Sequence, residues 1–251
     1  MRILFALFIF FTSYTFCFSQ SDKLSTPTGE VTITPVLHGT LVLQQDQKTI
    51  YIDPYGGAEL FKNFPDPDLV LITHPHGDHL NPETLKGITL DNTKLIAPQS
   101  VVDNLGDVEF STIQVLKNDE TTHFYGINIQ AFPMYNLPGS GTIRHEKGWG
   151  NGYILTFGDK KVYISGDTED IPEMRALKDI DMAFVCMNLP YTMDVESAAS
   201  AVIEFGPGIV YPYHFRGGGG KFSDVDKFKS LVNARNKNVE VRLRDWYPGD
   251  E

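Results

Sequence analysis

The heptapeptide Thr-His-Pro-His-Gly-Asp-His at residues 73–79 is the stretch on which the fold and the chemistry of this chain depend. It brings three imidazoles and one carboxylate within six residues, and both kinds of side chain bind borderline divalent metals. The apolar run 68–72 before it predicts a buried strand, and Pro75 and Gly77 predict a loop at the strand's carboxyl end. The alternative is a polar loop with histidines placed by chance, but clustered histidines are rarer than lone ones.

The spacing inside this stretch predicts places for two ions. His74 and His76 are two positions apart on extended chain, so their rings project to the same side and can share one ion. Gly77 would let the loop turn sharply, so that Asp78 and His79 face a second ion close by.

Three more donors lie elsewhere in the chain. Asp167 and His214 each follow an apolar run, and His145 lies in a long loop at 134–150. A set of nitrogen and oxygen donors without thiolate suits Zn, with Mn or Fe as alternatives. Taken alone, Asp167 could cap a turn and His214 could be a plain loop residue.

Two residues of the first half also end predicted strands. His38 and Asp53 could hydrogen-bond metal-bound histidines from outside the site, or could serve only their turns. Cys186 lies in the apolar run 182–187 and is expected to be a core residue.

Composition excludes some classes of partner. The chain has 251 residues and a formal net charge of -11, without a long run of Lys or Arg. This argues against nucleic acid or an anionic membrane surface as a partner, since both bind to basic patches. The length and the apolar content allow one domain with a full core.

The first residues differ in kind from the rest. Residues 1–19 have a short positive start, an apolar middle and small residues near Ser19, as in a secretory signal peptide. We expect export to the periplasm or the medium, with no stable membrane insertion after cleavage, and a retained anchor is the alternative. Residues 20–30 are polar and predict a linker, followed by one domain at 31–251.

The remaining pattern predicts two packed sheets with helices outside. Strands are expected at 31–37, 40–44, 49–53, 68–72, 93–97, 112–116, 121–124, 126–133, 152–157, 161–165, 182–187, 209–213 and 239–243, and helices at 82–86, 98–105, 171–177, 194–205 and 223–233.

The order of these motifs resembles the metallo-β-lactamase superfamily, and more narrowly the UlaG-like (ascorbate-phosphate lactonase-like) metal-dependent hydrolases. The resemblance runs from Val31 onward and rests on the histidine stretch, Gly-Asp-Thr at 166–168 and the late His214. Weaker supporting motifs are His-Gly-Thr at 38–40, Ile-Asp-Pro at 52–54, Pro-Met-Tyr-Asn at 133–136, Gly-Asn-Gly-Tyr at 150–153 and Met-Asn-Leu-Pro at 187–190.

The resemblance implies an α+β fold, a four-layer αβ/βα sandwich with two divalent metal ions at one edge of the sheets. By this likeness, the first metal is bound by His74 and His76, the second by Asp78, His79 and His214, and Asp167 bridges them. In many relatives a histidine directly after a strand is the third ligand of the first metal. Asn136 stands at that place here, so His145 or water would complete the set.

The implied activity is hydrolysis by metal-activated hydroxide of a small-molecule lactone, ester or phosphodiester. Asp167 would hold the ions together and Asp78 would orient the hydroxide. Candidates for substrate contacts are Arg144, Arg216, Tyr135, Tyr191 and Tyr213. Because Asn136 replaces a ligand, the alternative is an exported metal-binding or interaction protein on a catalytically impaired scaffold. A sandwich with a purely structural metal is a further alternative.

Overall fold

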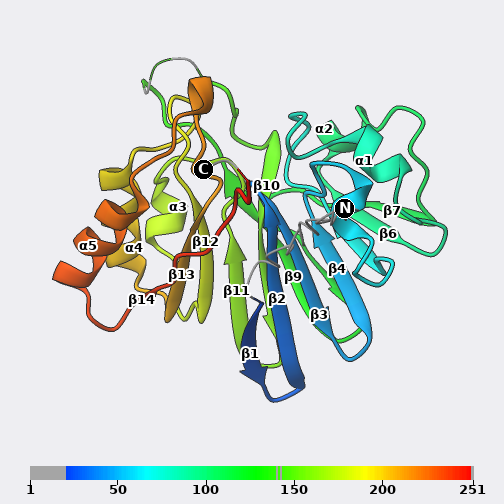
Figure 1. Ribbon diagram of the computed structural model, residues 1–251, viewed down its shortest axis with the longest axis horizontal. Helices are drawn as coiled ribbons and strands as arrows, with labels where there is room; N and C mark the ends of the chain where they lie inside the picture. Colours follow the sequence, from blue (N-terminus) through cyan, green and yellow to red (C-terminus); the bar gives the residue numbers. More distant parts are fainter. Residues whose placement is uncertain (1–20, 140, 142, 250–251) are drawn as a thin grey trace, which may run out of the picture.

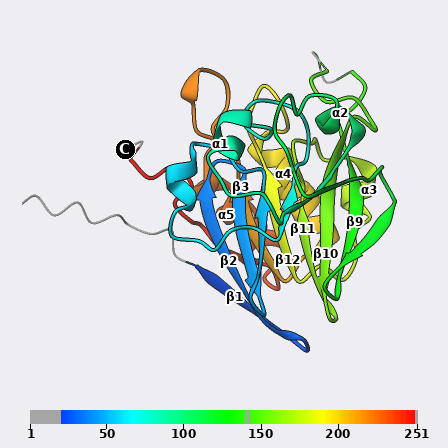
Figure 2. The same cartoon turned by 90° about the vertical axis from the view of Figure 1, so that its right-hand side faces the viewer.

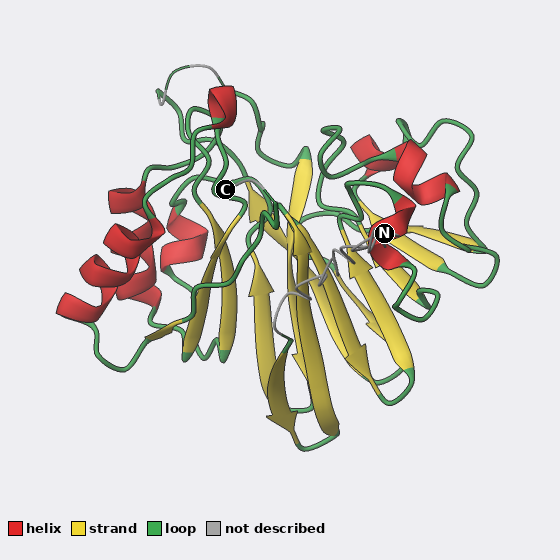
Figure 3. Ribbon diagram, in the orientation of Figure 1, coloured by secondary structure: helices red, strands yellow, loops and turns green. Residues whose placement is uncertain are grey.

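The computed structural model describes residues 21–139, 141 and 143–249, so the expected signal peptide at 1–19 lies outside the described residues. Two seven-stranded sheets pack face to face, with strand orders β1-β2-β3-β4-β5-β6-β7 and β14-β13-β12-β11-β10-β9-β8. Helices flank this pair of sheets on both outer sides (Figure 3). The predicted α+β sandwich with helices outside, in one domain, is confirmed.

Each sheet changes from antiparallel to parallel pairing along its width. In the first sheet, β1 to β4 are antiparallel and β4 to β7 are parallel. Its strands are β1 Asp22–Thr26, β2 Gly29–Leu37, β3 Thr40–Gln45, β4 Lys48–Ile52, β5 Leu69–Leu71, β6 Lys94–Ala97 and β7 Thr112–Val115. Since parallel strands end at the same edge, the loops after β4, β5 and β6 lie together.

The second sheet repeats this plan. Strands β8 to β11 are antiparallel and β11 to β14 are parallel. Its strands are β8 Thr121–Phe124, β9 Ile127–Met134, β10 Gly150–Phe157, β11 Lys160–Ile164, β12 Met182–Cys186, β13 Ile209–Tyr213 and β14 Glu240–Val241. The hairpin of β1 and β2 projects from the end of the molecule opposite to α1 and α2 (Figures 1 and 2).

The helices are short, and α4 shows why they form where they do. The Asp194 carboxylate accepts a hydrogen bond from the backbone N–H of Ser197, and Gly206 ends the helix with a left-handed φ of 57°. The helices are η1 Ala58–Phe61, α1 Pro82–Lys86, α2 Gln99–Val102, α3 Pro172–Arg175, α4 Val195–Phe205, η2 Gly218–Gly220 and α5 Val225–Arg235. Within the described ranges, every helix is too short or too polar to cross a lipid bilayer.

The main core lies between the sheets. One buried cluster includes Leu43 of β3 and Leu155 of β10. On the outer face of the first sheet, Val70 of β5 packs with Leu85 of α1 and Val101 of α2 in a second buried cluster. Burial of apolar surface on both faces of the first sheet fixes β5, and therefore the position of the loop that follows it.

Two sequence predictions need correction. The segment 20–30, predicted as a linker, contains β1, whose residues pair antiparallel with β2. As an edge strand β1 buries only Leu24, so its other residues are polar. The helix predicted at 98–105 stops at Val102, and the chain continues to Leu105 in tighter turns, in which Asn104 N–H donates to Val101 and Leu105 N–H to Val102.

Candidate metal centre

The structure brings all the residues predicted for the metal site into one cluster at the carboxyl edge of both sheets. The loop after β5 carries four of them, and the others follow β9, β11 and β13. Their donor atoms form three groups, each able to hold an ion: His74, His76 and His145; His38, Asp78 and His214; and His74, His79 and Asp167.

The first group is a convergence of three ring nitrogens. His76 Nδ1 lies 3.0 Å from His74 Nε2 and 3.2 Å from His145 Nε2. The hydroxyl of Thr73 donates to Asp53 Oδ2 and therefore accepts from His74 Nδ1 at 2.9 Å. With its proton on Nδ1, His74 presents a lone pair on Nε2 to the other two rings.

Asn136 fixes the third ring of this group. Its side-chain oxygen accepts from the backbone N–H groups of Arg144 and His145, both at 2.8 Å, and from His145 Nδ1 at 3.2 Å. Its amide nitrogen donates to Glu169 and to the carbonyl of Tyr191, so the orientation of the amide is determined. His145 therefore also carries its proton on Nδ1 and points an Nε2 lone pair at His76.

His79, His214 and Asp78 come from the other two groups and lie next to one another, and we call these three the second group. His79 Nδ1 donates to Asp53 Oδ2 at 2.7 Å, and His79 Nε2 lies 3.0 Å from His214 Nε2. Asp78 Oδ2 lies 3.4 Å from His214 Nε2. The same oxygen lies 3.1 Å from His38 Nε2.

Asp167 lies between the two groups. Its Oδ2 is 3.6 Å from His145 Nε2, and its Oδ1 is 3.6 Å from His79 Nε2 and 3.4 Å from His214 Nε2. Oδ1 is buried and accepts no hydrogen bond from any described residue. A buried carboxylate oxygen without a hydrogen-bond donor is costly, and cations between this oxygen and the ring nitrogens would remove that cost. The donor set therefore fits divalent metal ions.

Burial and charge divide the histidines into two electrostatic types. Burial lowers the pKa of His145 and of His38 to about 4, and lowers that of His74 well below its usual range. Burial also opposes protonation of His79, but Asp53 and the two site carboxylates outweigh it and raise the pKa to about 10. The His79 and His214 charges hold the pKa of Asp167 below its usual range in spite of burial.

Glycines permit the close approach of the rings. A Cβ at Gly39 would lie 3.2 Å from His79 and 3.3 Å from His214. The chain turns at Gly77 as expected, since the backbone N–H groups of His79 and Leu80 both donate to the carbonyl of His76. This turn does not depend on glycine, because the φ of Gly77 is not positive and no atom lies within 4 Å of a Cβ built there.

Several neighbours of the cluster gave little signal in the sequence. Thr73 and Asn136 orient ligand rings, and the Trp149 ring packs 5.1 Å from that of His76. Tyr247, near the end of the described chain, bonds His38 at 2.8 Å. Only the place of Thr73 inside the histidine stretch could have indicated its role.

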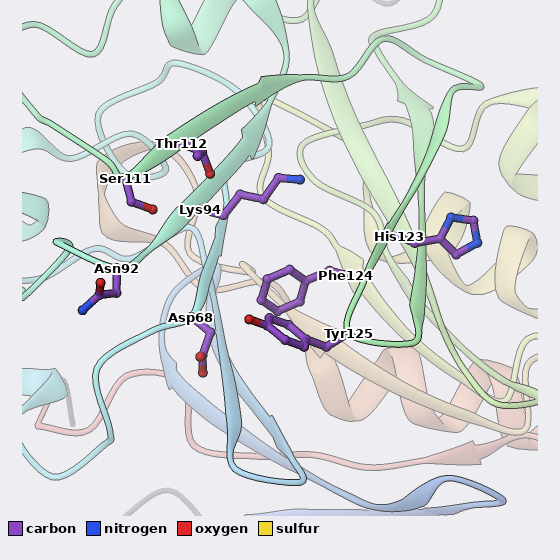
Figure 4. Close-up of a pocket in the computed structure, with 8 residues that line it drawn as sticks. All are labelled: Asp68, Asn92, Lys94, Ser111, Thr112, His123, Phe124 and Tyr125. Carbon is purple, nitrogen blue, oxygen red and sulfur yellow. The ribbon is translucent and has the colours of Figure 1, made fainter.

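A separate hollow of about 370 Å³ lies away from the candidate metal ligands, between the starts of β6 and β7 and the β8–β9 turn (Figure 4). Asp68 in its wall already accepts hydrogen bonds from Lys48 and from the backbone of Thr49, and Ser111 donates to a backbone carbonyl. The His123 ring points away from Asp68 (Figure 4). We assign no site to this hollow.

Comparison with known families decides the identity of the fold. The model of the β-lactamase superfamily domain matches residues 32–214. The chain belongs to the metallo-β-lactamase superfamily. Its match spans every predicted metal-site residue, from the histidine stretch to His214.

Relatives of this superfamily member are metal-dependent hydrolases by name. The UPF0173 metal-dependent hydrolase of Pyrococcus abyssi is 27% identical over 82% of this chain and 92% of its own length. That of Staphylococcus carnosus is 29% identical over 85% of this chain and 96% of its own.

Solved structures agree with this assignment. A metal-dependent hydrolase from Parabacteroides distasonis is 40% identical, covers 92% of this chain and 100% of its own, and superposes with a TM-score of 0.80. A metallo hydrolase from Ignicoccus hospitalis is 25% identical, covers 85% and 94%, and has a TM-score of 0.70. This superfamily member is therefore a metal-dependent hydrolase, and its fold implies divalent metal ions.

Proposed function

We propose that this metallo-β-lactamase superfamily member is a dinuclear hydrolase, with zinc in both places, that acts on a small-molecule lactone, ester or phosphodiester. The observation that carries the proposal is the position of Asp167, whose two carboxylate oxygens face two separate groups of imidazoles. A carboxylate with one oxygen toward each group is the arrangement that a bridging ligand requires.

The donors divide as follows in this proposal. His74, His76 and His145 would hold one ion. Asp78, His79 and His214 would hold the other, and Asp167 would contact both. Bound there, the ions would lower the pKa of water towards about 7 and polarise a carbonyl or phosphoryl oxygen of the substrate. Asp78, half-buried at the mouth of the site, would accept a hydrogen bond from the attacking water.

Two guanidinium groups support an anionic or strongly polar substrate. Arg144 lies over the Tyr191 ring at 5.6 Å, and its charge helps to lower the pKa of His76, after burial and the charge of His79. Arg216 lies over the Tyr247 ring at 4.7 Å. Such groups would stabilise the negative charge that develops on a lactone, ester or phosphate oxygen during attack.

The alternative of an impaired binding protein was motivated by the absence of a histidine at position 136. Asn136 instead holds His145 against His74 and His76, so the first group has three nitrogen donors without it. We therefore favour the enzyme.

The test is metal counting combined with a substrate panel. The purified chain is reconstituted with Zn, Mn or Fe, and turnover of lactones, esters and phosphodiesters is measured. About two ions per chain, with turnover that a chelator abolishes, are expected. A single tightly bound ion without turnover across the three classes would favour the binding protein.

We also propose export, supported by the apolar leader at 1–19. Amino-terminal sequencing of the protein recovered from fractionated cells tests it. A chain that begins after the leader and lies outside the cytoplasm is expected, and an uncleaved chain held in the membrane would indicate the retained anchor.

A further inference from the structure

A series of hydrogen bonds connects the last described segment of the chain with Asp78. The backbone N–H of Arg216 donates to Tyr247 Oη at 3.0 Å. Tyr247 Oη lies 2.8 Å from His38 Nδ1, and His38 Nε2 lies 3.1 Å from Asp78 Oδ2. The connection joins the loops after β13 and β14 in the second sheet to the loops after β2 and β5 in the first.

The direction of these bonds follows from the groups at each end. The Tyr247 hydroxyl accepts from the backbone N–H of Arg216, so it donates its own proton to His38 Nδ1. Nδ1 of His38 is then an acceptor, and the proton of the ring is on Nε2. Nε2 donates that proton to Asp78 Oδ2.

We propose that Tyr247 and His38 are a positioning pair that orients the Asp78 carboxylate at the second group of donors. His38 is therefore not a metal ligand, although its Nε2 lies near the donor atoms of Asp78 and His214, because that nitrogen carries the proton. A carboxylate oxygen has two lone pairs, so Asp78 Oδ2 can accept from His38 and still face an ion. Tyr247 lies outside the matched range 32–214, so the pair adds a residue from beyond it.

The surroundings hold this pair rigidly. His38 has a left-handed φ of 59°, donates its backbone N–H to the carbonyl of Trp246, and accepts from the backbone of His214 at 3.2 Å. The Tyr247 ring packs 5.0 Å from Phe215 and 4.9 Å from Phe222. Because both partners are fixed by the backbone and by packing, the hydroxyl is aimed at Nδ1 without further ordering of side chains.

The pair completes a pattern seen at the other rings. Asp53 orients His79, Thr73 orients His74 and Asn136 orients His145, each by a hydrogen bond to Nδ1. Asp78 is only half-buried, so without a bond from a neighbour its carboxylate could change rotamer. A bond from His38 removes that freedom.

The first test determines which ring nitrogen of His38 carries the proton. Nitrogen chemical shifts of the histidine rings, measured by NMR on the metal-free and the zinc-loaded chain, are expected to show His38 with its proton on Nε2 in both forms. Tyr247→Phe keeps the ring and removes only the hydroxyl, so the His38 Nδ1 resonance is expected to shift. A wild-type His38 with its proton on Nδ1 would overturn the proposal.

The second test measures one ion at a time by competition with a chelator. Tyr247→Phe is expected to lower the affinity of the chain for one of two zinc ions by about 10–100-fold. It is also expected to lower kcat more than it changes KM. The matched control is Tyr51→Phe, which removes a buried hydroxyl that bonds the carbonyl of Pro65, on the far side of the first sheet. If Tyr247→Phe changes only thermal stability, as Tyr51→Phe should, the pair has no positioning role.

The proposal rests on the dinuclear function, but the two fail separately. If the wild type binds one ion and turns nothing over while His38 shows the expected tautomer and responds to Tyr247→Phe, the dinuclear function is wrong and the pair stands. If the wild type binds two ions and hydrolyses substrate while Tyr247→Phe matches the control, the pair alone is wrong.

Discussion

Asn136 Oδ1 accepts a hydrogen bond from the backbone N–H of His145 at 2.8 Å, nine positions further along the chain. In return the backbone N–H of Asn136 donates to the carbonyl of His145 at 2.9 Å. The loop after β9 is thereby folded back onto its own start. The ring of His145 is thereby held beside those of His74 and His76.

Removal of the Asn136 side chain should therefore weaken the binding of an ion at His74, His76 and His145. Asn136→Ala is expected to lower the affinity of the chain for one of two zinc ions by about 10–100-fold, because His145 loses the bonds that fix its ring and its backbone. Titration against a chelator measures this. Asn236→Ala, at the end of α5, is the control, since its side chain bonds only the backbone there. Equal zinc affinities in the two variants would contradict the role given to Asn136.

Asp53→Asn tests the hydrogen bond by which Asp53 orients the ring of His79. Among the carboxylates that raise the pKa of His79, Asp53 has the largest effect, although burial opposes them all. We expect the pKa of His79 in the metal-free variant to fall, and zinc affinity at one place to drop by about 10–100-fold. NMR titration and chelator competition provide the two readings. Asp68→Asn, which alters a carboxylate that bonds Lys48 and Thr49, should change neither.

Gly39→Ala should damage the site more than the fold. The added methyl group would meet His79 at 3.2 Å and His214 at 3.3 Å, so at least one ring must move by a few tenths of an ångström. A loss of zinc affinity and of kcat of about tenfold is expected, with a small change in the melting temperature. Gly77→Ala is the matched control, because nothing lies near its Cβ. Wild-type kinetics in Gly39→Ala would show that the rings adjust freely.

The stability of the metal-free chain should be greatest near pH 6.5. His38 and His145 have folded pKa values of about 4, below the unfolded value, so stability falls as pH drops from about 6.5 towards 4. His79 has a folded pKa of about 10, so its contribution is complete below about 6.5 and is lost as pH rises through 10. Each group contributes a slope of at most about 1.4 kcal/mol per pH unit. Urea unfolding measured across this pH range checks the predicted maximum. A free energy of unfolding that rises below pH 6 would contradict the prediction.

The edge strand β1 should contribute to stability. Asp22 accepts hydrogen bonds from Arg242 at 3.2 Å and from Arg244 at 2.7 and 2.8 Å, which joins the first sheet to the segment after β14. Asp22→Ala is expected to reduce the free energy of unfolding by about 1–3 kcal/mol, because two partly buried guanidinium groups each lose one carboxylate partner. Denaturant titration measures it. Lys23→Ala, which breaks only an exposed pair with Glu30, should cost less than about 1 kcal/mol.

The sequence was sufficient for the fold and for the members of the cluster, because their signals are local. The apolar run before position 73 and the turn residues after it predict a strand end, and strand ends also carry Asp167 and His214. The parallel parts of both sheets then bring these ends to one edge.

The contacts between distant segments could not be predicted in the same way. Nothing near Tyr247 indicates that its hydroxyl meets His38, because 209 positions separate them and only the closed sandwich brings them together. Asn136 gives the appearance of a missing ligand until the fold of the loop shows what it holds. The strand β1 resembles a linker because one face of an edge strand needs few apolar side chains.

The donors come from both halves of the sandwich. Positions 74 to 79 belong to the first sheet, whereas positions 145, 167 and 214 belong to the second. Neither half alone has a complete coordination sphere, so a nascent chain cannot capture its cations until the halves have docked. Cations that bind after docking would cross-link the two sheets. Their release would therefore be an early step in the unfolding of the enzyme.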